Sequence, residues 1–340
     1  MNLEIKKKDQ ILYEEIHLRH INLLIDLKNN HFNNWFFRMA LINTFDDLKI
    51  FLSKLEKNKY KCIIAIESKK IIGYVYTYPI NNKKTCLKIS SPSIIKESKY
   101  IPTRELILNL IRHSIESHNS NISNWFISSE VNDNDLISCS RELGFQPLQE
   151  IILWEKKISY KYFDYDKFYS YEQINKSNIK SFLNFVRSNE NIVIRNLLDL
   201  DYSDIYKRSN KECGMIKNKE GILLGILKDI SYQNQNIYSI IRGELWDIEL
   251  NNILRNILQK LNEKERNIVF KTYSHDKELN SFLSDLNFLE IRQELILVRN
   301  TLIKRVVKSN NLINKPWDNF IGKINPQGNA YPSPMPIKYK

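Results

Sequence analysis

The sequence predicts an α/β protein of the α+β type, with two similar tandem domains followed by an extended C-terminal tail. Three observations support this prediction. The chain has 340 residues, more than the ~100–200 residues of an ordinary domain. Helical and extended segments through residues 10–157 come again in nearly the same order through residues 165–300. After residue 303 this pattern stops and prolines accumulate. We therefore expect domains at residues 1–160 and 161–303 and a tail at residues 304–340.

The composition is that of a folded protein. Hydrophobic residues make up 42% of the chain and aromatic residues 11%, enough for two cores and too much for a disordered chain. The first residues, MNLEIKKKDQ, lack the apolar core of a secretion signal. No apolar run approaches the ~18–20 residues that span a bilayer. We expect a cytoplasmic protein with no membrane partner.

The chain is basic, with 51 Lys and Arg against 39 Asp and Glu and a net charge of +12. Such a charge favours anionic partners. However, the lysines are scattered, and the longest basic run is Lys6-Lys7-Lys8. A nucleic-acid surface usually concentrates Lys and Arg on one face or stripe. We therefore do not expect a nucleic-acid partner. A basic protein that binds nucleic acid is kept as a third hypothesis, after the two given at the end of this section.

The cysteines and histidines predict no metal site. Neither of the two closest histidine pairs lies beside a cysteine, and no C-x-x-C pair is present. We expect reduced cysteines in a cytosolic protein. The cysteines are Cys62, Cys86, Cys139 and Cys213, and the histidine pairs are His17 with His20 and His113 with His118.

The first half begins with a helical pattern over residues 10–57, interrupted by an extended piece at 15–20. Thr44 and Asp47 resemble the cap of a helix at residues 45–55. β-rich runs then predict strands at 61–67, 71–79, 85–89, 125–129 and 150–155. Apolar residues at helical spacing predict helices at 104–117 and 133–143. We expect Gly144 to end the second of these helices as a left-handed cap.

The second half repeats these elements. Helices are expected at residues 178–186, 193–205, 248–261 and 277–286, and strands at 213–216, 222–227, 237–241, 268–273 and 294–298. The hairpin glycines Gly73 and Gly225 lie 152 residues apart, and the helix ends Gly144-Phe145 and Asn287-Phe288 lie 143 apart. This near-constant offset favours a duplicated domain over a chance recurrence of common elements.

The tail carries Pro316, Pro326, Pro332, Pro334 and Pro336. Proline lacks an amide donor and disfavours helix in the preceding residue, which predicts an extended segment. Trp317 and Phe320 either pin this segment to a groove or belong to a floppy terminus.

Two segments of the first half resemble the GNAT superfamily of N-acetyltransferases. They are Ile71-Ile72-Gly73-Tyr74-Val75 on the hairpin and the segment from Asn132 to Phe145, which is similar to the superfamily's N-x-x-A-x-x-L-Y-x-x-x-G-F pattern. The resemblance covers residues 10–157 by motif and 165–300 by pattern only. It implies two tandem GNAT-like domains, each a mixed, mostly antiparallel sheet flanked by helices.

The resemblance also implies a chemistry. Members of the superfamily splay their central strands and lay the pantetheine of an acyl-CoA in the gap. The pyrophosphate meets the start of the next helix, where free N–H groups favour anions. An acceptor amine then attacks the thioester, and a tyrosine often returns a proton to the thiolate. Acetyl-CoA or another acyl-CoA is the expected co-substrate, without a metal.

The phosphate loop departs from the superfamily pattern R/Q-x-x-G-x-G/A. Residues 96–104 hold no glycine, and residues 242–247 hold one glycine at another spacing together with two acids. Acids facing a pyrophosphate would repel it, so the second half looks unable to bind CoA. The first half offers side chains at a helix start, although an ordinary solvated loop with a helix cap at Thr103 is the competing interpretation. The cofactor-binding candidates are Ser91, Ser98, Lys99, Thr103, Arg104 and Asn132.

The catalytic candidates are weak. Ser140 stands where the superfamily has its tyrosine, and Leu283 stands there in the second half. A serine hydroxyl is a poorer acid than a phenol of pKa ~10. Glu130 either serves as the base for the amine or is a surface carboxylate, and Asn132 either bonds the cofactor or caps a helix. Cys139 lacks a histidine that would make it a nucleophile.

Two main functional hypotheses follow from these residues. The first is an acyl-CoA-dependent N-acyltransferase whose site lies in the first half, with an amine acceptor that the sequence does not reveal. The alternative is a catalytically inactive tandem GNAT protein that serves as a protein-binding or assembly module.

Overall fold

A computed structural model describes most of the chain up to residue 301. The described residues are 11–20, 22–23, 40, 61–118, 122–156, 170–209, 213–219, 221–229, 236–243, 250–255, 257–258 and 268–301. The expected helix at 45–55, the boundary at residue 160 and the tail at 304–340 lie outside them. Residues Met1–Ile303 form one compact unit.

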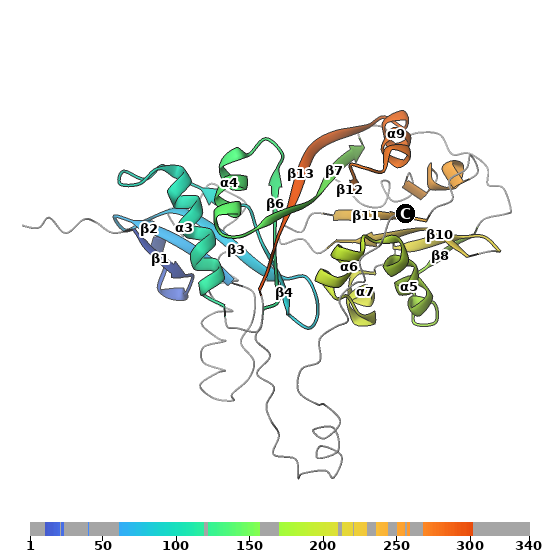
Figure 1. Cartoon of the computed structure of the whole chain (residues 1–340), viewed down its shortest axis with the longest axis horizontal. Helices are drawn as coiled ribbons and strands as arrows, with labels where there is room; N and C mark the ends of the chain where they lie inside the picture. The colour runs from blue at the N-terminus through green and yellow to red at the C-terminus, as the bar shows by residue number, and fades with distance from the viewer. Residues whose placement is uncertain are drawn as a thin grey trace, which may run out of the picture. The chain divides into compact units, whose positions relative to one another are not determined.

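Among its described residues, the first half is a sheet on which helices pack (Figure 1). Its elements follow the predicted order from residue 61 onward. They are β1 (Leu12–Glu15), the short helix η1 (Leu18–His20), β2 (Lys61–Glu67), β3 (Lys70–Pro79), β4 (Cys86–Ile89), β5 (Ser93–Ile94), α3 (Thr103–Glu116), β6 (Asn124–Glu130), α4 (Asn134–Glu142) and β7 (Gln146–Lys156).

The second half repeats that order, with three helices at its start and a helical stretch at residues 250–255 and 257–258. Its elements are β8 (Ser170–Gln173), α5 (Ile179–Asn189), α6 (Ile192–Leu198), α7 (Tyr202–Arg208), β9 (Gly214–Lys217), β10 (Ile222–Lys228), β11 (Asn236–Arg242), β12 (Ile268–Tyr273), α9 (Lys277–Asp285) and β13 (Phe288–Asn300). The mixed, mostly antiparallel sheet flanked by helices that the sequence predicts is confirmed.

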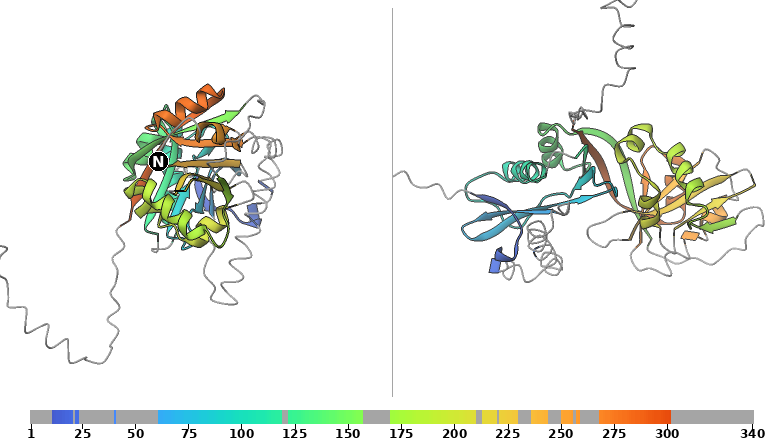
Figure 2. Two further views of the ribbon diagram at one scale, coloured as in Figure 1. Left: turned by 90° about the vertical axis from the view of Figure 1, so that its right-hand side faces the viewer. Right: turned by 90° about the horizontal axis from the view of Figure 1, so that it is seen from below.

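The two halves exchange their last strands. The sheet runs in the order β1-β2-β3-β4-β6-β13-β7-β12-β11-β10-β9-β8, with β5 paired to β3. β13, from the end of the second half, lies between β6 and β7 of the first, and β7 pairs with β12 of the second (Figures 1 and 2). Because a strand edge carries unpaired N–H and C=O groups, this exchange leaves each half dependent on the other.

The hydrophobic cores show the same exchange. Leu297 of β13 is fully buried in the core of the first half, together with Trp125 and Phe145. Ile152 and Trp154 of β7 belong to the core of the second half. The indole Nε1 of Trp154 also donates to Thr272 Oγ1 of β12 at 2.9 Å. One continuous sheet therefore joins two cores.

Corresponding helices have matching ends. The side chain of Asp133 caps α4, and that of Asp276 caps α9. Their φ/ψ values are −82°/77° and −81°/74°. After the helices, Gly144 and Asn287 take positive φ values of 86° and 55°. Asparagine tolerates the left-handed region better than most residues, so it replaces glycine there.

The two hairpin glycines allow close packing of a helix on the sheet. A Cβ at Gly73 would lie 3.3 Å from Leu110 Cδ1 of α3, and one at Gly225 would lie 2.5 Å from Phe182 Cε2 of α5. The absence of a side chain therefore lets a large apolar residue meet the strand in both halves.

The connection between β3 and β4 packs against α6 and α7 of the second half. The Asn82 amide donates to Asp204 Oδ1 at 2.6 Å, and Arg208 Nη2 donates to the Ile80 carbonyl at 2.6 Å. Asn124 Nδ2 donates to the Leu197 carbonyl at 2.8 Å. These hydrogen bonds join the halves away from the exchanged strands.

Two predictions of local structure are wrong. The helical pattern from residue 10 fails at Leu12–Glu15, which pairs with β2 as β1, and the piece expected to be extended ends in η1. The helix expected at 193–205 is two helices, because Asp199 adopts a left-handed conformation with φ 44° after α6. Asp201 then begins α7 with a capping box. The sequence pattern also missed β5 and β8.

The exchange of strands predicts that the halves unfold together. We expect Leu297→Ala to lower the free energy of unfolding by about 2–5 kcal/mol, because it leaves a cavity in the first core. Hydrogen exchange should then rise in both β6 and β12, since β13 and β7 link them. The control Leu289→Ala, on the same strand and 40% exposed, should change stability much less. Faster exchange in β6 with unchanged exchange in β12 would contradict joint unfolding.

Candidate active site between β4 and β6

The parallel strands β4 and β6 diverge at one end. They pair from Cys86 and Asn124 as far as Ile89 and Ile127. Beyond these residues β6 continues to Glu130, whereas the chain after β4 turns toward β3 and pairs with it as β5. Two central strands therefore separate, as the superfamily resemblance implies.

Local hydrogen bonds cause this divergence. The Ser90 amide donates to the Tyr76 carbonyl at 2.9 Å, and Ser90 Oγ accepts from the Tyr76 amide at 3.0 Å. Both bonds hold the chain on β3 instead of β6. Pro92 follows and has no amide to offer to a neighbouring strand. Within the described residues, one bond crosses the gap from Ser91: its Oγ donates to the Ser128 carbonyl at 3.0 Å.

A cavity of about 290 Å³ adjoins the diverging strands. The first half supplies Ser90, Ser91, Pro92, Ser128 and Glu130 to its wall, and the second half supplies residues of β11, β12 and β13 and the residue that follows β10. The residues from the second half are Asp229, Ile237, Lys271, Arg292, Glu294 and Ile296. Both halves therefore line the cavity, because β13 of the second half lies beside β6 of the first.

Both carboxylates and cations line this cavity. Glu130 lies directly opposite Glu294 in the β6–β13 register, and like charges in that position repel each other. Arg292 relieves the repulsion, with Nη2 2.5 Å from Glu294 Oε1 and Nη1 3.7 Å from Glu130 Oε1. The side chain of Glu130 is 60% exposed, so its carboxylate remains accessible.

Asp229 and Lys271 form an ion pair in the same wall. Burial acts to raise the pKa of the Asp229 carboxyl, but the positive charges of Lys271, Arg208 and Lys88 outweigh it and lower the pKa below its usual value. Asp229 also accepts from Ser239 Oγ at 3.0 Å. This carboxylate therefore stays ionised and fixes the lysine on β12.

The N-terminus of α3 is open. Its N-cap is Pro102, which gives no side-chain cap, and no described group accepts from the amides of residues 103–105. In contrast, α4 is capped by Asp133, whose Oδ1 accepts from the Leu136 amide at 2.9 Å. Free N–H groups at a helix start attract anions. Thr103 is the first helical residue, so its interpretation as the cap is wrong.

The expected phosphate-binding residues gather around this helix start. The guanidinium of Arg104 lies 2.9 Å from Glu142 Oε2, with both side chains about half exposed. Ser98 Oγ accepts from the amides of Tyr100 and Ile101, which orders the turn before the helix. The backbone amide of Lys99 donates to Glu67 Oε1 at 3.2 Å, and its side chain is exposed.

The other candidates are placed differently. Asn132 is exposed in the turn before α4, and the cap there is Asp133, so its interpretation as a cap is wrong. Ser140 is fully buried, its Oγ has no hydrogen-bond partner among the described residues, and it does not line the cavity. Burial raises the pKa of the Cys139 thiol, which disfavours a nucleophilic thiolate.

The corresponding gap in the second half is bridged. β11 and β12 pair in parallel as far as Ser239 and Lys271, and β11 continues to Arg242. The guanidinium of Arg242 lies 3.2 Å from Asp276 Oδ1 and 2.5 Å from Glu278 Oε2, both at the start of α9. Arg242 therefore links the two strand ends; residues 244–249 lie outside the described residues.

The sequence did not predict that residues of the second half line the cavity beside β4 and β6. Asp229, Lys271, Arg292 and Glu294 reach the cavity only because of the strand exchange. Nothing in their local sequence distinguishes them from surface charges on strands. Only the pairing partners of β7 and β13 reveal their place.

Comparison with known proteins gives structural neighbours only. No family model and no curated protein matches the chain. A GCN5-related N-acetyltransferase of Sphaerobacter thermophilus has 7% identity and a TM-score of 0.48, with 75% of this chain and 84% of that chain covered. A tandem GNAT protein from the clavulanic acid biosynthesis pathway has 5% identity and a TM-score of 0.49, covering 86% and 98%. A Drosophila protein has 8% identity and a TM-score of 0.50, covering 86% and 99%.

The solved structures that this chain resembles therefore include GNAT acetyltransferases, one of them a tandem protein. At such identities the likeness concerns the fold alone and assigns no substrate. Among the described residues, no cluster of His, Cys, Asp and Glu suits a metal ion, and the helices are too short or too polar to cross a membrane. The four cysteines are buried and form no disulfide.

The Asp229–Lys271 pair predicts a dependence of stability on pH. The pKa of Asp229 is lower in the fold than the ~3.9 of an unfolded chain. Its stabilising effect is therefore complete well above pH ~4 and disappears as the pH falls through the lowered pKa. We expect Asp229→Asn to reduce stability at neutral pH by about 1–3 kcal/mol, because Lys271 loses its partner.

Urea unfolding at neutral pH and at pH ~3 measures this difference, which should shrink in acid. The control Glu278→Gln removes a 60% exposed carboxylate and should change stability by less than ~1 kcal/mol. A deficit in Asp229→Asn that stays constant down to pH ~2 would contradict the lowered pKa.

Proposed function

We propose that this protein is an acyl-CoA-dependent N-acyltransferase, transferring an acetyl group to an amine in the cavity beside β4 and β6. The observation that carries the proposal is the divergence of the paired strands after Ile89 and Ile127. The open start of α3 in the same half supports it. The gap between the strands would hold the pantetheine arm of an acyl-CoA, and the free amides at the start of α3 would bind its phosphates.

The residues of the first half fit an acyl-CoA. The free amides at 103–105 and the guanidinium of Arg104 would hold the pyrophosphate. The hydroxyl of Ser91 would exchange its bond to the Ser128 carbonyl for one to the pantetheine arm. The bound acyl-CoA would supply an activated acyl group.

Glu130 is the base that this proposal assigns. Its accessible carboxylate lines the cavity and would take a proton from the incoming ammonium ion. The free amine attacks the thioester carbonyl, a C–N bond forms and the C–S bond breaks. The second proton lost by nitrogen neutralises the thiolate through water, since Ser140 does not line the cavity. Arg292 Nη1, 3.7 Å from Glu130 Oε1, would hold this carboxylate at the cavity wall.

The alternative is an inactive tandem protein that binds a partner protein. Two observations favour it. The hydrogen bond from Ser91 to Ser128 already crosses the gap in the first half, and Arg242 links the corresponding ends of β11 and β12 in the second half. Binding of CoA separates the alternatives, because a module without chemistry has no need of an open phosphate site.

We expect calorimetry to detect acetyl-CoA binding to the full chain. Arg104→Glu should weaken it by at least about tenfold, equivalent to ~1.4 kcal/mol, by placing a negative charge at the pyrophosphate. The control Arg112→Glu, on an exposed face of the same helix, should bind like the wild type. Absence of any heat with acetyl-CoA would overturn the proposal and favour the inactive module.

Removal of the base should affect catalysis and leave binding intact. With acetyl-CoA and a panel of primary amines, Glu130→Gln should reduce kcat by about 10²–10⁴-fold with little change in acetyl-CoA affinity. The rate of CoA release measures this effect. A variant as fast as the wild type would show that Glu130 is not the base.

A further inference from the structure

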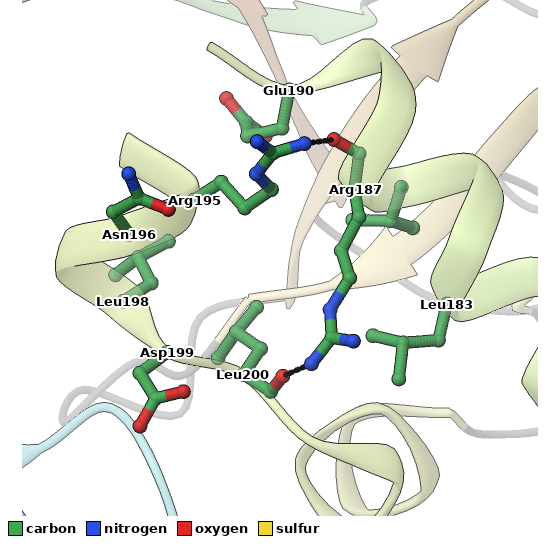
Figure 3. Close-up of a pocket in the computed structure, with 9 residues that line it drawn as sticks. Leu183, Arg187, Glu190, Arg195, Asn196, Leu198, Asp199 and Leu200 are labelled. Carbon is green, nitrogen blue, oxygen red and sulfur yellow. Dashed lines mark hydrogen bonds between the residues drawn. The ribbon is translucent and has the colours of Figure 1, made fainter. Parts of the chain in front are cut away.

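We propose that a second cavity, between α5 and α6, binds a small organic anion: a carboxylate or phosphate on an apolar body. This cavity has a volume of about 410 Å³, within the ~300–1,000 Å³ typical of small-molecule sites. It has no lining residue in common with the cavity beside β4 and β6. Figure 3 shows the residues around it.

The wall combines apolar side chains with two arginines. Four apolar side chains line the cavity and would cover the body of a ligand: Leu183 and Val186 of α5, Leu198 of α6 and Leu200. Arg187 and Arg195 project from the two helices. Apolar walls with few placed polar groups are the usual composition of a ligand site.

Among the described residues, one backbone carbonyl accepts a hydrogen bond from each guanidinium. Arg195 Nη1 donates to the Arg187 carbonyl at 2.9 Å, and Arg187 Nη2 donates to the Leu200 carbonyl at 2.7 Å (Figure 3). Among the described residues, neither group has a carboxylate within 4.0 Å. A guanidinium has five N–H donors in a rigid plane, so both retain donors for an anion.

The acids of the cavity are engaged elsewhere. Asp199 Oδ2 pairs with Lys83 Nζ at 2.5 Å. Glu190 Oε1 accepts from the hydroxyl of Tyr273 at 2.5 Å, and burial raises the pKa of Glu190 despite this bond. Together with Lys83, the two arginines give three cations against two carboxylates, a net positive charge that an anionic ligand would neutralise.

A structural role alone does not explain the whole arrangement. Arg195 satisfies a carbonyl of the last turn of α5, and Arg187 satisfies the carbonyl that follows α6. Each task uses one donor and requires neither the cavity nor its apolar wall. Selective binding of an anion distinguishes a ligand site from two arginines that serve only to bind backbone carbonyls.

The experiment compares hexanoate, its neutral analogue hexanamide and inorganic phosphate as probes of the full chain by calorimetry. We expect hexanoate to bind and hexanamide not to bind. Arg187→Gln and Arg195→Gln should each weaken hexanoate binding at least about tenfold. The control Arg112→Gln should leave it unchanged. Phosphate binding that is lost in the same two variants also supports the proposal and shows that the anionic group alone suffices.

A further variant guards against loss of folding. Asn196 is exposed on α6 and lines the cavity, so Asn196→Trp should obstruct it without removing a buried contact. Weaker hexanoate binding at an unchanged melting temperature supports the site. Equal binding of hexanoate and hexanamide, no binding of either anion, or wild-type affinity in all three variants would overturn it. These outcomes are independent of acetyl-CoA binding in the first half.

Discussion

The exchange of β7 and β13 is the constraint on which the structure depends. Each half ends its sheet at a strand, β6 or β12, whose outer edge needs a partner. The partner in both cases comes from the other half. Since unpaired backbone groups are costly when buried, neither half can be removed without exposing the edge of the other. The halves therefore form a single sheet.

This exchange also builds the candidate site. The gap between β4 and β6 belongs to the first half, but β13 supplies Arg292 and Glu294 beside it and β12 supplies Lys271. The electrostatics that the proposed acceptor meets are thus set largely by the second half. In that half Arg242 joins the end of β11 to the start of α9. The two halves therefore have similar folds but differ at the strand ends where a CoA would bind.

The sequence pattern predicted most elements because their periodicity is local. Strands β2 and β12 begin and end where the pattern places them, and Gly144 ends α4 in the expected left-handed conformation. The break between α6 and α7 was missed because it depends on the backbone of Asp199. The partner of β13 was missed because pairing over a long sequence distance leaves no local signal. The cavity residues of the second half were missed for the same reason, whereas Glu130 and Ser91, which line the cavity, were candidates from the sequence.

Hydrogen exchange of the full chain with and without CoA tests the central claim that the first half alone receives the thioester carrier. The account predicts slower exchange at the amides of residues 90–105, where the strands diverge and α3 begins, and unchanged exchange at the end of β11. Protection at β11 and the start of α9, or no protection in either half, would contradict it.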